Sequence, residues 1–469
     1  MTERVGRVAI VALIVGLALH NAAMAQLWDL GIRGDRLDVF AAWKEILLVA
    51  AVVVLGWSLR GRLRFTTVDV LAAAYAAAVL LYAVVPQGWL DGEATSRGEL
   101  LALRHHLLPV GGYVLGRLLG TIRRDTAWLG GTIVLVAAGV AFLGLLDLAV
   151  VSLQAWRESG VPSWYSEQLG LDYLGLSGLP ENWVYNTGDE QNPIRRLVST
   201  FLSPLATAYA LVVALIYVVS RPLRWWWALA AALLYVGLLY THTRAAFAAL
   251  AVGLVVLAVA QRRLAPAVLG VASVVVSAGF LAVYPDIGPT TSYTPEELEF
   301  LRANAERDPG DNADPFSPGE SSASSHWQNL RDGVEAVVEH PQGYGLGNAG
   351  VVAKRTGVDI KAGESTYAEL GVDIGVLGLA LFVLWSSALL LLLLRREAWV
   401  AAAFAIVLLL GLQTDVIGIH WLAVAVWAAA GIVASRPQPA PAPVEATPEP
   451  ALPPPPAAPP APVQSQGTV

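Results

Sequence analysis

Two arginines and one glutamate stand just before apolar stretches of the chain. Arg196 precedes LVSTFLSPLATAYAL, Arg244 precedes AAFAALAVGL, and Glu364 comes shortly before TYAELGVDIGVLGLALF. A guanidinium at membrane depth is costly unless it reaches water, a counter-charge or a phosphate, which it grips with two parallel hydrogen bonds. A carboxylate at the same level can take a proton from an attacking hydroxyl. We therefore expect these three residues to converge on one site, although each arginine could also simply reach the membrane interface.

Five further residues are candidates for substrate binding: Arg195, Lys44, His326, His340 and Tyr367. His326 and His340 are alternative proton acceptors. His340 also stands before a proline at an expected helix end, where a cation favours the helix dipole. Lys44 can be neutralised by its neighbour Glu45 inside the bundle, and Arg195 can reach the interface. For His340, Lys44 and Arg195, a structural role is therefore the alternative to substrate binding.

The sequence offers little for a metal or a cofactor. There is no cysteine, and the adjacent His105 and His106 point about 100° apart on a helix, so they cannot easily share one ion. Gly345, Gly347 and Gly350 spell GxGxxG, but no strand precedes them, so we interpret the motif as a tight turn. We expect no metal, no cofactor and no nucleic-acid partner.

Composition sets the class of protein. Of the 469 residues, 56% are hydrophobic and 14% charged, and the mean hydropathy is +0.57. These values are typical of a polytopic membrane protein and predict an all-α fold, because a helix satisfies its own backbone hydrogen bonds in lipid. The first apolar run resembles a secretory signal but is longer than a signal core, so we expect it to be retained as a span.

We expect twelve spans, each near the roughly 20 residues that a transmembrane helix needs. They cover residues 5–25, 39–59, 68–85, 100–119, 127–153, 197–219, 225–240, 244–260, 264–284, 367–394, 399–412 and 416–434. Threading them alternately gathers one set of arginines on a single side, at residues 60–64, 123–124, 221–224, 262–263 and 395–396. By the positive-inside rule that side is the cytoplasm, so both termini are cytoplasmic.

The same threading divides the chain into four parts. Residues 1–284 hold nine spans and an outward loop at 155–195, residues 285–365 form a larger outward loop, and residues 366–435 hold three spans. The Pro/Ala-rich stretch 436–469 has nothing to pack, so we expect a disordered tail without a catalytic role.

The larger outward loop contains one predicted helix. Its apolar residues recur at helical spacing, at Trp327, Leu330, Val334, Val337 and Val338. They predict a helix over 324–339 that lies over the membrane domain. A proline ends this helix, and a Gly-rich turn follows.

Three stretches together resemble the O-antigen ligase and polymerase family. RLVSTFLSPLATAYAL is similar to the family's R-x-x-G-T-F-x-x-P-x-x-x-A-x-Y-L stretch, with Ser199 in place of Gly. THTRAAF resembles its T-x-S-R motif, with Thr243 in place of Ser. HWQNLRDGVEAVVEHPQGYGLGNAG followed by ESTYAELGVDIGVLGLALF resembles its outward-loop signature. The resemblance runs in order from Arg196 to Phe382.

The resemblance implies a GT-C-like glycosyltransferase of the bacterial inner membrane whose site faces outward. The expected partners are a glycan donor on a polyprenyl diphosphate, usually undecaprenyl diphosphate, an acceptor glycan or glycolipid, and membrane lipids, with a chain-length regulator as a further candidate. Arg196 and Arg244 would then hold the diphosphate, and Glu364 would accept the proton of the acceptor. Direct displacement would invert the anomeric carbon without a metal.

One departure from the family bears on the acceptor. The ligase branch carries a His where this chain has Glu364. The departure favours a polymerase of surface polysaccharide, and a ligase acting on lipid A core or another acceptor is the alternative.

Functions of two other classes stay open. A transporter could select an anionic substrate with arginines at membrane level, but we find no repeated halves and no discontinuous spans in the sequence. An assembly scaffold could bind through the outward loop and the tail. Of the three, a transferase alone would lengthen or transfer a glycan.

Overall fold

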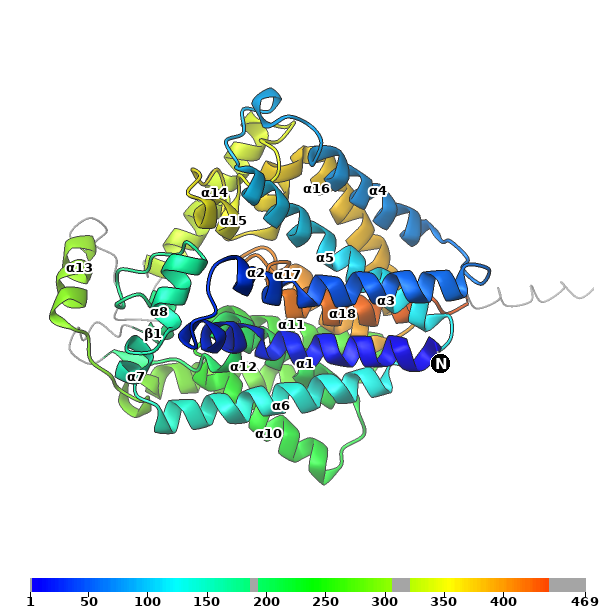
Figure 1. The fold of residues 1–469 in the computed structure, drawn as a ribbon. Helices are drawn as coiled ribbons and strands as arrows, with labels where there is room; N and C mark the ends of the chain where they lie inside the picture. The colour runs from blue at the N-terminus through cyan, green and yellow to red at the C-terminus, as the bar shows by residue number, and fades with distance from the viewer. Residues whose placement is uncertain (1, 186–192, 306–320, 438–469) are drawn as a thin grey trace, which may run out of the picture. The chain divides into compact units, whose positions relative to one another are not determined.

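The computed structural model describes residues 2–185, 193–305 and 321–437, which form helices and their connections (Figure 1). Among these residues, six helical segments are long and apolar enough to cross a membrane, and five shorter helices are also apolar. The protein is therefore an all-α, multi-pass membrane protein, and the count of twelve spans stays a prediction. The helices that correspond to the predicted spans are α1 (Thr2–Asp29), α3 (Trp43–Leu59), α4 (Thr67–Tyr82), α5 (Ser96–Gly120), α6 (Ala127–Val150), α9 (Pro204–Ser220), α10 (Trp225–Tyr240), α11 (Arg244–Gln261), α12 (Ala265–Ile287), α16 (Thr366–Leu394), α17 (Ala398–Leu410) and α18 (His420–Ala434).

The predicted apolar runs coincide with these helices, although α3 and α18 begin four residues later than expected and α9 seven residues later. We expected a span over 197–219, whereas α9 begins at Pro204. The preceding residues cannot continue a helix, because Ser199 and Leu202 have φ angles of 52° and 51°, in the left-handed region. The sequence predicted that Arg196 stands directly at the start of a span. In the structure it lies in the connection before α9.

Small residues let α5 and α18 approach closely. Gly112, Gly116 and Gly120 recur every fourth residue along α5, and a Cβ at Gly116 would lie 2.0 Å from the carbonyl oxygen of Ala428. Small residues at this spacing bring membrane helices into backbone contact. Because α5 also carries His105, the contact fixes a polar side chain inside the bundle.

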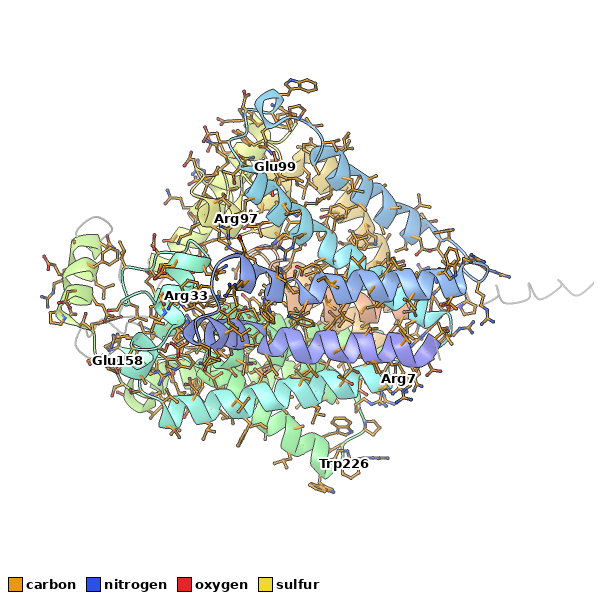
Figure 2. All side chains as sticks on the ribbon, in the orientation of Figure 1. Arg7, Arg33, Arg97, Glu99, Glu158 and Trp226 are labelled. Carbon is orange, nitrogen blue, oxygen red and sulfur yellow. The ribbon has the colours of Figure 1, made fainter. Side chains whose placement is uncertain are left out.

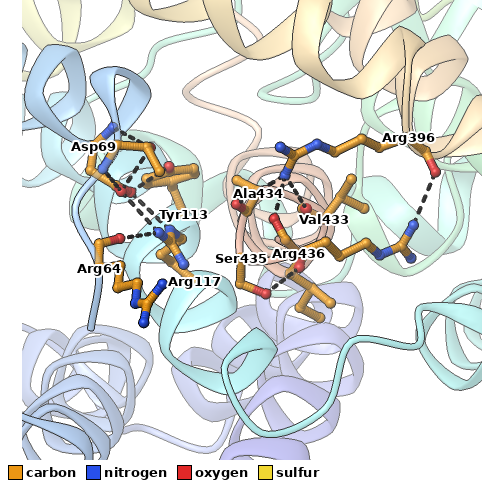
Figure 3. Close-up of polar contacts among 11 residues, drawn as sticks. Arg64, Asp69, Tyr113, Arg117, Arg396, Val433, Ala434, Ser435 and Arg436 are labelled. Carbon is orange, nitrogen blue, oxygen red and sulfur yellow. Dashed lines mark hydrogen bonds and ion pairs between the residues drawn. The ribbon is translucent and has the colours of Figure 1, made fainter. Parts of the chain in front are cut away.

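Arginines that bond to carboxylates and carbonyls hold one end of the bundle (Figure 3). Arg117 on α5 donates to both carboxylate oxygens of Asp69 on α4 at 3.0 Å, and also to the carbonyl of Arg64 at 2.6 Å. Arg396 and Arg436 each donate to the other's carbonyl, at 2.7 and 3.0 Å. The arginine-rich connections after α3 and α16 thus lie at the same end, as the threading predicts.

The two long loops lie at the opposite end. Figure 1 shows α7 (Leu153–Arg157), α8 (Val161–Ser163) and α13 (Pro295–Ala305) on the left, away from the N-terminus, and Figure 2 shows Arg33 and Glu158 on that side and Arg7 on the other. The loops are joined by an ion pair of 2.6 Å between Arg157 and the buried Glu297.

The remaining short elements are α2 (Asp35–Ala41), α15 (Gly350–Thr356), the antiparallel strands β1 (Val184–Tyr185) and β2 (Ile194–Arg195), a π-turn η2 (Trp164–Gln168), and the 3₁₀ turns η1 (Gln87–Trp89), η3 (Glu181–Trp183) and η4 (Ser199–Phe201).

Helix α14 (Ser321–Glu339) confirms the predicted loop helix, and it packs against α16. Gly333 and Val337 lie against α16. Trp327, Val334 and Val338 are 72%, 54% and 72% exposed. Val337, one of the predicted apolar residues, therefore makes the close contact together with Gly333, which the apolar spacing did not include.

Helix α16 is interrupted, which corrects the expectation that the chain has no discontinuous span. Ile374 and Gly375 leave helical geometry, and Gly375 has a φ of 65°. The Gly-rich turn after α14 docks at this break, where the N–H of Tyr344 donates to the carbonyl of Val372 at 2.7 Å. A loop on one side of the membrane domain is thereby tied into the helix.

The GxGxxG glycines behave as a tight turn, as predicted. Gly345, Gly347 and Gly350 have φ angles of 96°, 93° and 56°, which favour glycine because it has no Cβ. The N–H groups of Gly347 and Asn348 donate to Oδ1 of Asp373 on α16, at 3.2 and 3.1 Å. The turn thus wraps a carboxylate of the protein itself.

The bundle extends one residue into the predicted tail. Arg436 pairs with Glu397 at 2.8 Å and donates through Nε to the carbonyl of Arg124 at 3.1 Å. Residues 438–469 lie outside the described part of the chain, so the expected disorder of the tail stays a prediction.

Candidate active site

Arg196 is fixed in the connection between β2 and α9. Its backbone N–H donates to the carbonyl of Trp183 at 2.8 Å. Its partly buried guanidinium donates through Nε to the carbonyl of Thr241 at 2.8 Å and through Nη2 to Oγ1 of Thr243 at 3.1 Å. These partners are neutral, and among the described residues no carboxylate pairs with Arg196. Within the described chain, the partners of Arg196 therefore fix its position and do not neutralise its charge.

The connection between α10 and α11 brings two more basic residues to Arg196. Arg244 is the first residue of α11, as predicted. His242 is buried and lies between the rings of Tyr185 and Tyr284, with centroid distances of 4.1 and 4.9 Å. Both arginines act electrostatically on this imidazole. Arg196, His242 and Arg244 thus form one basic cluster at the head of α11.

Burial sets the protonation states in this cluster. Burial lowers the pKa of Arg196 to about 10, with Arg244 adding to the shift, so the guanidinium stays charged at neutral pH. Burial, and then Arg196 and Arg244, lower the pKa of His242 to about 3, so the imidazole is neutral. Its Nε2 atom has no hydrogen-bond partner within the described chain. The cluster therefore presents cationic guanidinium groups beside a neutral ring, an arrangement that suits phosphate oxygens.

Two departures from the family motifs have a structural explanation. Thr243 replaces Ser, and its hydroxyl accepts the hydrogen bond from Arg196. Either residue supplies this acceptor. Ser199 replaces Gly, and its φ of 52° is one that glycine adopts freely. The Ser199 hydroxyl donates to the carbonyl of Val140 at 2.6 Å, which anchors the serine in this conformation.

Glu364 lies just before α16 and pairs with α14. Its Oε2 atom is 2.5 Å from Nδ1 of His326, and its φ of 61° is unusual for a residue with a side chain. The hydrogen bond with His326 holds the pKa of Glu364 below its ordinary value, so the carboxylate is ionised at neutral pH and can accept a proton. The structure thus joins two residues that the sequence offers as alternative bases.

Helix α17 links the basic cluster to the Glu364–His326 pair. The N–H of Thr366 donates to the carbonyl of Gly411, directly after α17, at 2.9 Å, and α17 packs along α11, which Arg244 opens. Among the described residues, no hydrogen bond or ion pair joins Glu364 to Arg196. The predicted convergence of the carboxylate with the two arginines therefore stays a prediction.

Arg195 and Lys44 have partners within the fold. The buried Arg195 places Nη2 3.2 Å from Oδ2 of Asp147. Lys44 donates to the carbonyl of Ala41 at 2.8 Å and lies 3.5 Å from Glu45, the neighbour expected to neutralise it. These contacts give both residues a structural role, and their contacts with substrate stay predictions.

His340 and Tyr367 are also engaged in local contacts. His340 follows the last residue of α14 and stacks on Tyr344, with ring centroids 4.3 Å apart, and its Nε2 is 3.6 Å from Asp91. Tyr367 donates from its hydroxyl to the carbonyl of Leu408 at 2.8 Å, which ties α16 to α17. A direct part in substrate binding stays a prediction for both.

The segment that carries most of these residues matches a known family. Residues 229–383 match the family model described as O-antigen ligase. The chain carries an O-antigen ligase family region. The predicted resemblance is confirmed, and the region includes His242, Arg244 and Glu364 but not Arg196. No curated protein matches the chain.

The family region and the apolar helices together define the general activity. The protein is a multi-pass membrane enzyme of surface polysaccharide assembly, with a glycosyltransferase-like activity. The O-antigen ligase region extends from α10 into α16, so it contains both the head of α11 and the loop that ends at Glu364. Most of the basic cluster and the carboxylate pair thus fall within the part that matches.

Sequence reasoning missed two groups of residues. His242 stands inside the THTR motif, and that position was the available signal. His105, Glu369 and Asp415 offer a nitrogen and two oxygens that all lie within 4.8 Å of one another. These three residues come from separate parts of the chain, so no spacing could reveal them. The expectation that the protein binds no metal stays a prediction.

Proposed function

We propose that this protein moves a glycan from a polyprenyl diphosphate, such as undecaprenyl diphosphate, to an acceptor sugar at the outer face of the bacterial inner membrane. The observation that carries the proposal is the basic cluster at the head of α11. Arg196 is held by neutral partners and lacks a carboxylate within the described chain, and a guanidinium in this condition favours a phosphate ligand. The family region supports the same class of reaction.

Arg196 and Arg244 hold the diphosphate of the donor and stabilise the charge that develops as it leaves. The carbonyl of Thr241 and the hydroxyl of Thr243 fix the orientation of Arg196 before the donor binds. Charged donors that are already oriented stabilise a transition state most effectively, because no reorganisation is required during the reaction. The guanidinium groups supply the positive charge for this step themselves, so the transfer needs no metal.

Glu364 accepts the proton of the acceptor hydroxyl. The hydroxyl oxygen attacks the anomeric carbon of the donor, and the bond from this carbon to the diphosphate oxygen breaks. The diphosphate leaves with the bonding electrons, the proton passes to Glu364, and the anomeric carbon is inverted. His326 keeps the carboxylate oriented and ionised through the bond of 2.5 Å.

A polymerase of surface polysaccharide is the favoured assignment. Glu364 occupies the position where the ligase branch of the resembled family carries a His. The acceptor would then be another lipid-linked glycan, and a chain-length regulator would be a further partner. A ligase that acts on lipid A core or a different acceptor is the alternative.

One observation favours a function of another class. The break in α16 at Ile374 and Gly375 is a feature of transporters that bind substrate at interrupted helices. In this protein, however, the Gly-rich turn docks at the break through its own backbone. A transferase therefore accounts for more of the observed site than a transporter does.

The test is an assay with purified protein in lipid and a lipid-linked oligosaccharide. We expect glycan products longer than the donor when the donor is supplied alone, with release of polyprenyl diphosphate. Product that forms only when a lipid A core acceptor is added would assign the ligase activity. Binding of the donor without any glycosidic product, in protein that is correctly folded, would contradict a transferase.

A further inference from the structure

A second polar group lies away from the basic cluster, where α5, α16 and the connection from α17 to α18 meet. It consists of His105, Glu369 and Asp415, whose ligand atoms all lie within 4.8 Å of one another. Nε2 of His105 and Oδ2 of Asp415 are 3.2 Å apart. Two ligands of one ion, each about 2.0 to 2.2 Å from it, lie roughly 3 to 3.5 Å apart. The His105–Asp415 separation therefore fits a shared metal ion.

The ion pair between His105 and Asp415 does not account for the burial of the third carboxylate, Glu369. Its side chain is 7% exposed, yet in the described chain no basic group forms an ion pair with it and no side chain donates a hydrogen bond to it. A buried carboxylate without a balancing charge is strongly unfavourable. Its oxygen faces His105 and Asp415, so a cation at this point would balance it.

Other nearby acidic groups are already satisfied. Asp373, one turn further along α16, pairs with His106 at 2.8 Å and accepts two backbone N–H groups. Oδ1 of Asp415 accepts the N–H of Gly418 at 3.0 Å, which leaves Oδ2 to face His105. Among these acidic residues, the negative charge without a partner is therefore confined to the cluster of His105, Glu369 and Asp415.

Two glycines keep space around the carboxylates. A Cβ at Gly350 would lie 2.3 Å from Oε2 of Glu369, and a Cβ at Gly418 would lie 2.1 Å from Oδ2 of Asp415. Any larger residue at these positions would occupy the place of the carboxylate oxygens. The local backbone is therefore shaped around these oxygens.

We propose that His105, Glu369 and Asp415 bind one divalent transition-metal ion of the Zn²⁺ or Mn²⁺ class. One imidazole and two carboxylates suit these ions, whereas Mg²⁺ prefers oxygen ligands throughout. The ion ties α5 to α16 and to the start of α18, and it lies one turn along α16 from the segment that carries Glu364. The site is structural and does not depend on the proposed glycosyl transfer.

The test measures metal binding by the full-length protein without an affinity tag. After treatment with EDTA, the protein in detergent is titrated with ZnCl₂, and bound zinc and Tm are recorded. We expect one zinc per chain and a higher Tm, because a ligand that binds the native state stabilises it. Glu369→Gln and His105→Asn should weaken binding at least tenfold, since even partners behind the ligands contribute 10- to 100-fold to affinity in other sites.

His106→Asn is the matched control, because it alters the adjacent histidine and should leave zinc affinity unchanged. No zinc on the wild-type protein at millimolar ZnCl₂ would overturn the proposal, and so would equal losses in His105→Asn and His106→Asn. If the variants do not fold, X-ray absorption of the zinc-loaded wild-type protein decides the question. One imidazole with oxygen ligands supports the site, and any other number of imidazoles overturns it.

Discussion

Arg117 and Arg436 at one end of the bundle differ from Arg196 at the other end in the partners that the described chain gives them. At the end that carries the N-terminus, Arg117 bonds to both oxygens of Asp69, and Arg436 pairs with Glu397. At the opposite end, Arg196 bonds to a carbonyl and a hydroxyl. A guanidinium that is oriented but not neutralised can accept an anion, whereas one that is paired holds helices together. Position in a membrane helix bundle is therefore a weaker guide to function than the charge of the partners.

Neighbouring residues show the same difference. Arg195 is buried and paired with Asp147 at 3.2 Å, so its charge is balanced within the fold. Arg196 follows directly in the chain, and no carboxylate pairs with it in the described structure. Because the two arginines are adjacent, their position in the sequence does not distinguish them. Their partners in the fold give Arg195 a structural role and leave Arg196 as the candidate for binding.

The largest effect is expected at the carboxylate that completes the proposed site. Glu364→Gln keeps the shape but removes the proton acceptor, so turnover should fall by roughly 10² to 10⁴, as for lost acid–base catalysis elsewhere. Donor binding should be largely kept. The assay is transfer from a lipid-linked oligosaccharide, with Glu339→Gln as the control. Normal turnover in Glu364→Gln, with loss in His326→Ala or His340→Ala, would assign the base to a histidine.

Removal of either arginine of the basic cluster should come next in size. Arg196→Ala and Arg244→Ala should each lower turnover by about 10² to 10³, the range seen when one charge-stabilising donor is lost. The Lys variants should lie between these and the wild type, because an ammonium cannot form the two-pronged contact. Arg331→Ala, on the exposed face of α14, is the control. Full transfer by all four variants would leave the cluster as an interfacial anchor.

Removal of a balanced arginine should affect stability and spare donor binding. Arg117→Ala leaves the carboxylate of Asp69 without its cation, and breaking a buried ion pair costs about 3 to 5 kcal/mol. We expect a lower Tm in detergent and an unchanged affinity for polyprenyl diphosphate per folded molecule. A selective loss of donor affinity at unchanged Tm would break the distinction between arginines paired with a carboxylate and those of the basic cluster.

The smallest effect concerns pH. The bond from His326 lowers the pKa of Glu364, so the base is ionised at neutral pH and activity should be lost only as the pH falls through that lowered pKa. His326→Ala removes the bond, raises the pKa of Glu364 toward its ordinary value, and should move the acid limb of the pH–rate profile to higher pH. A shift to lower pH, or none, would mean that His326 does not set the charge of Glu364.

The sequence predicted the helices well because long apolar runs permit few alternatives in a membrane. It failed where local backbone conformation decided the outcome. The segment 197–203 is apolar and resembles the start of a helix, but positive φ at Ser199 and Leu202 delays α9 until Pro204. The contact of Gly333 with α16 could not be found either, because hydrophobic spacing does not show where a glycine packs.

The candidate site was predictable in part. Arg196 and Arg244 could be found because charged residues next to apolar runs are conspicuous, and their motifs extended the argument. The partners of these residues could not be found in this way. Three contacts depend on how the helices pack. Thr241 and Thr243 orient Arg196, His242 contacts two tyrosines, and His105 meets residues of two distant elements.

Binding of the donor diphosphate by Arg196 and Arg244 is the central step of the proposed mechanism. It is tested most directly by equilibrium binding of undecaprenyl diphosphate and undecaprenyl monophosphate to wild-type protein, Arg196→Lys and Arg244→Lys, with Arg331→Lys as the control. The wild-type protein and the control should prefer the diphosphate, and each of the other two variants should lose most of that preference because the two-pronged contact is gone. Undiminished preference in both Arg196→Lys and Arg244→Lys, with correctly folded protein, would contradict the claim.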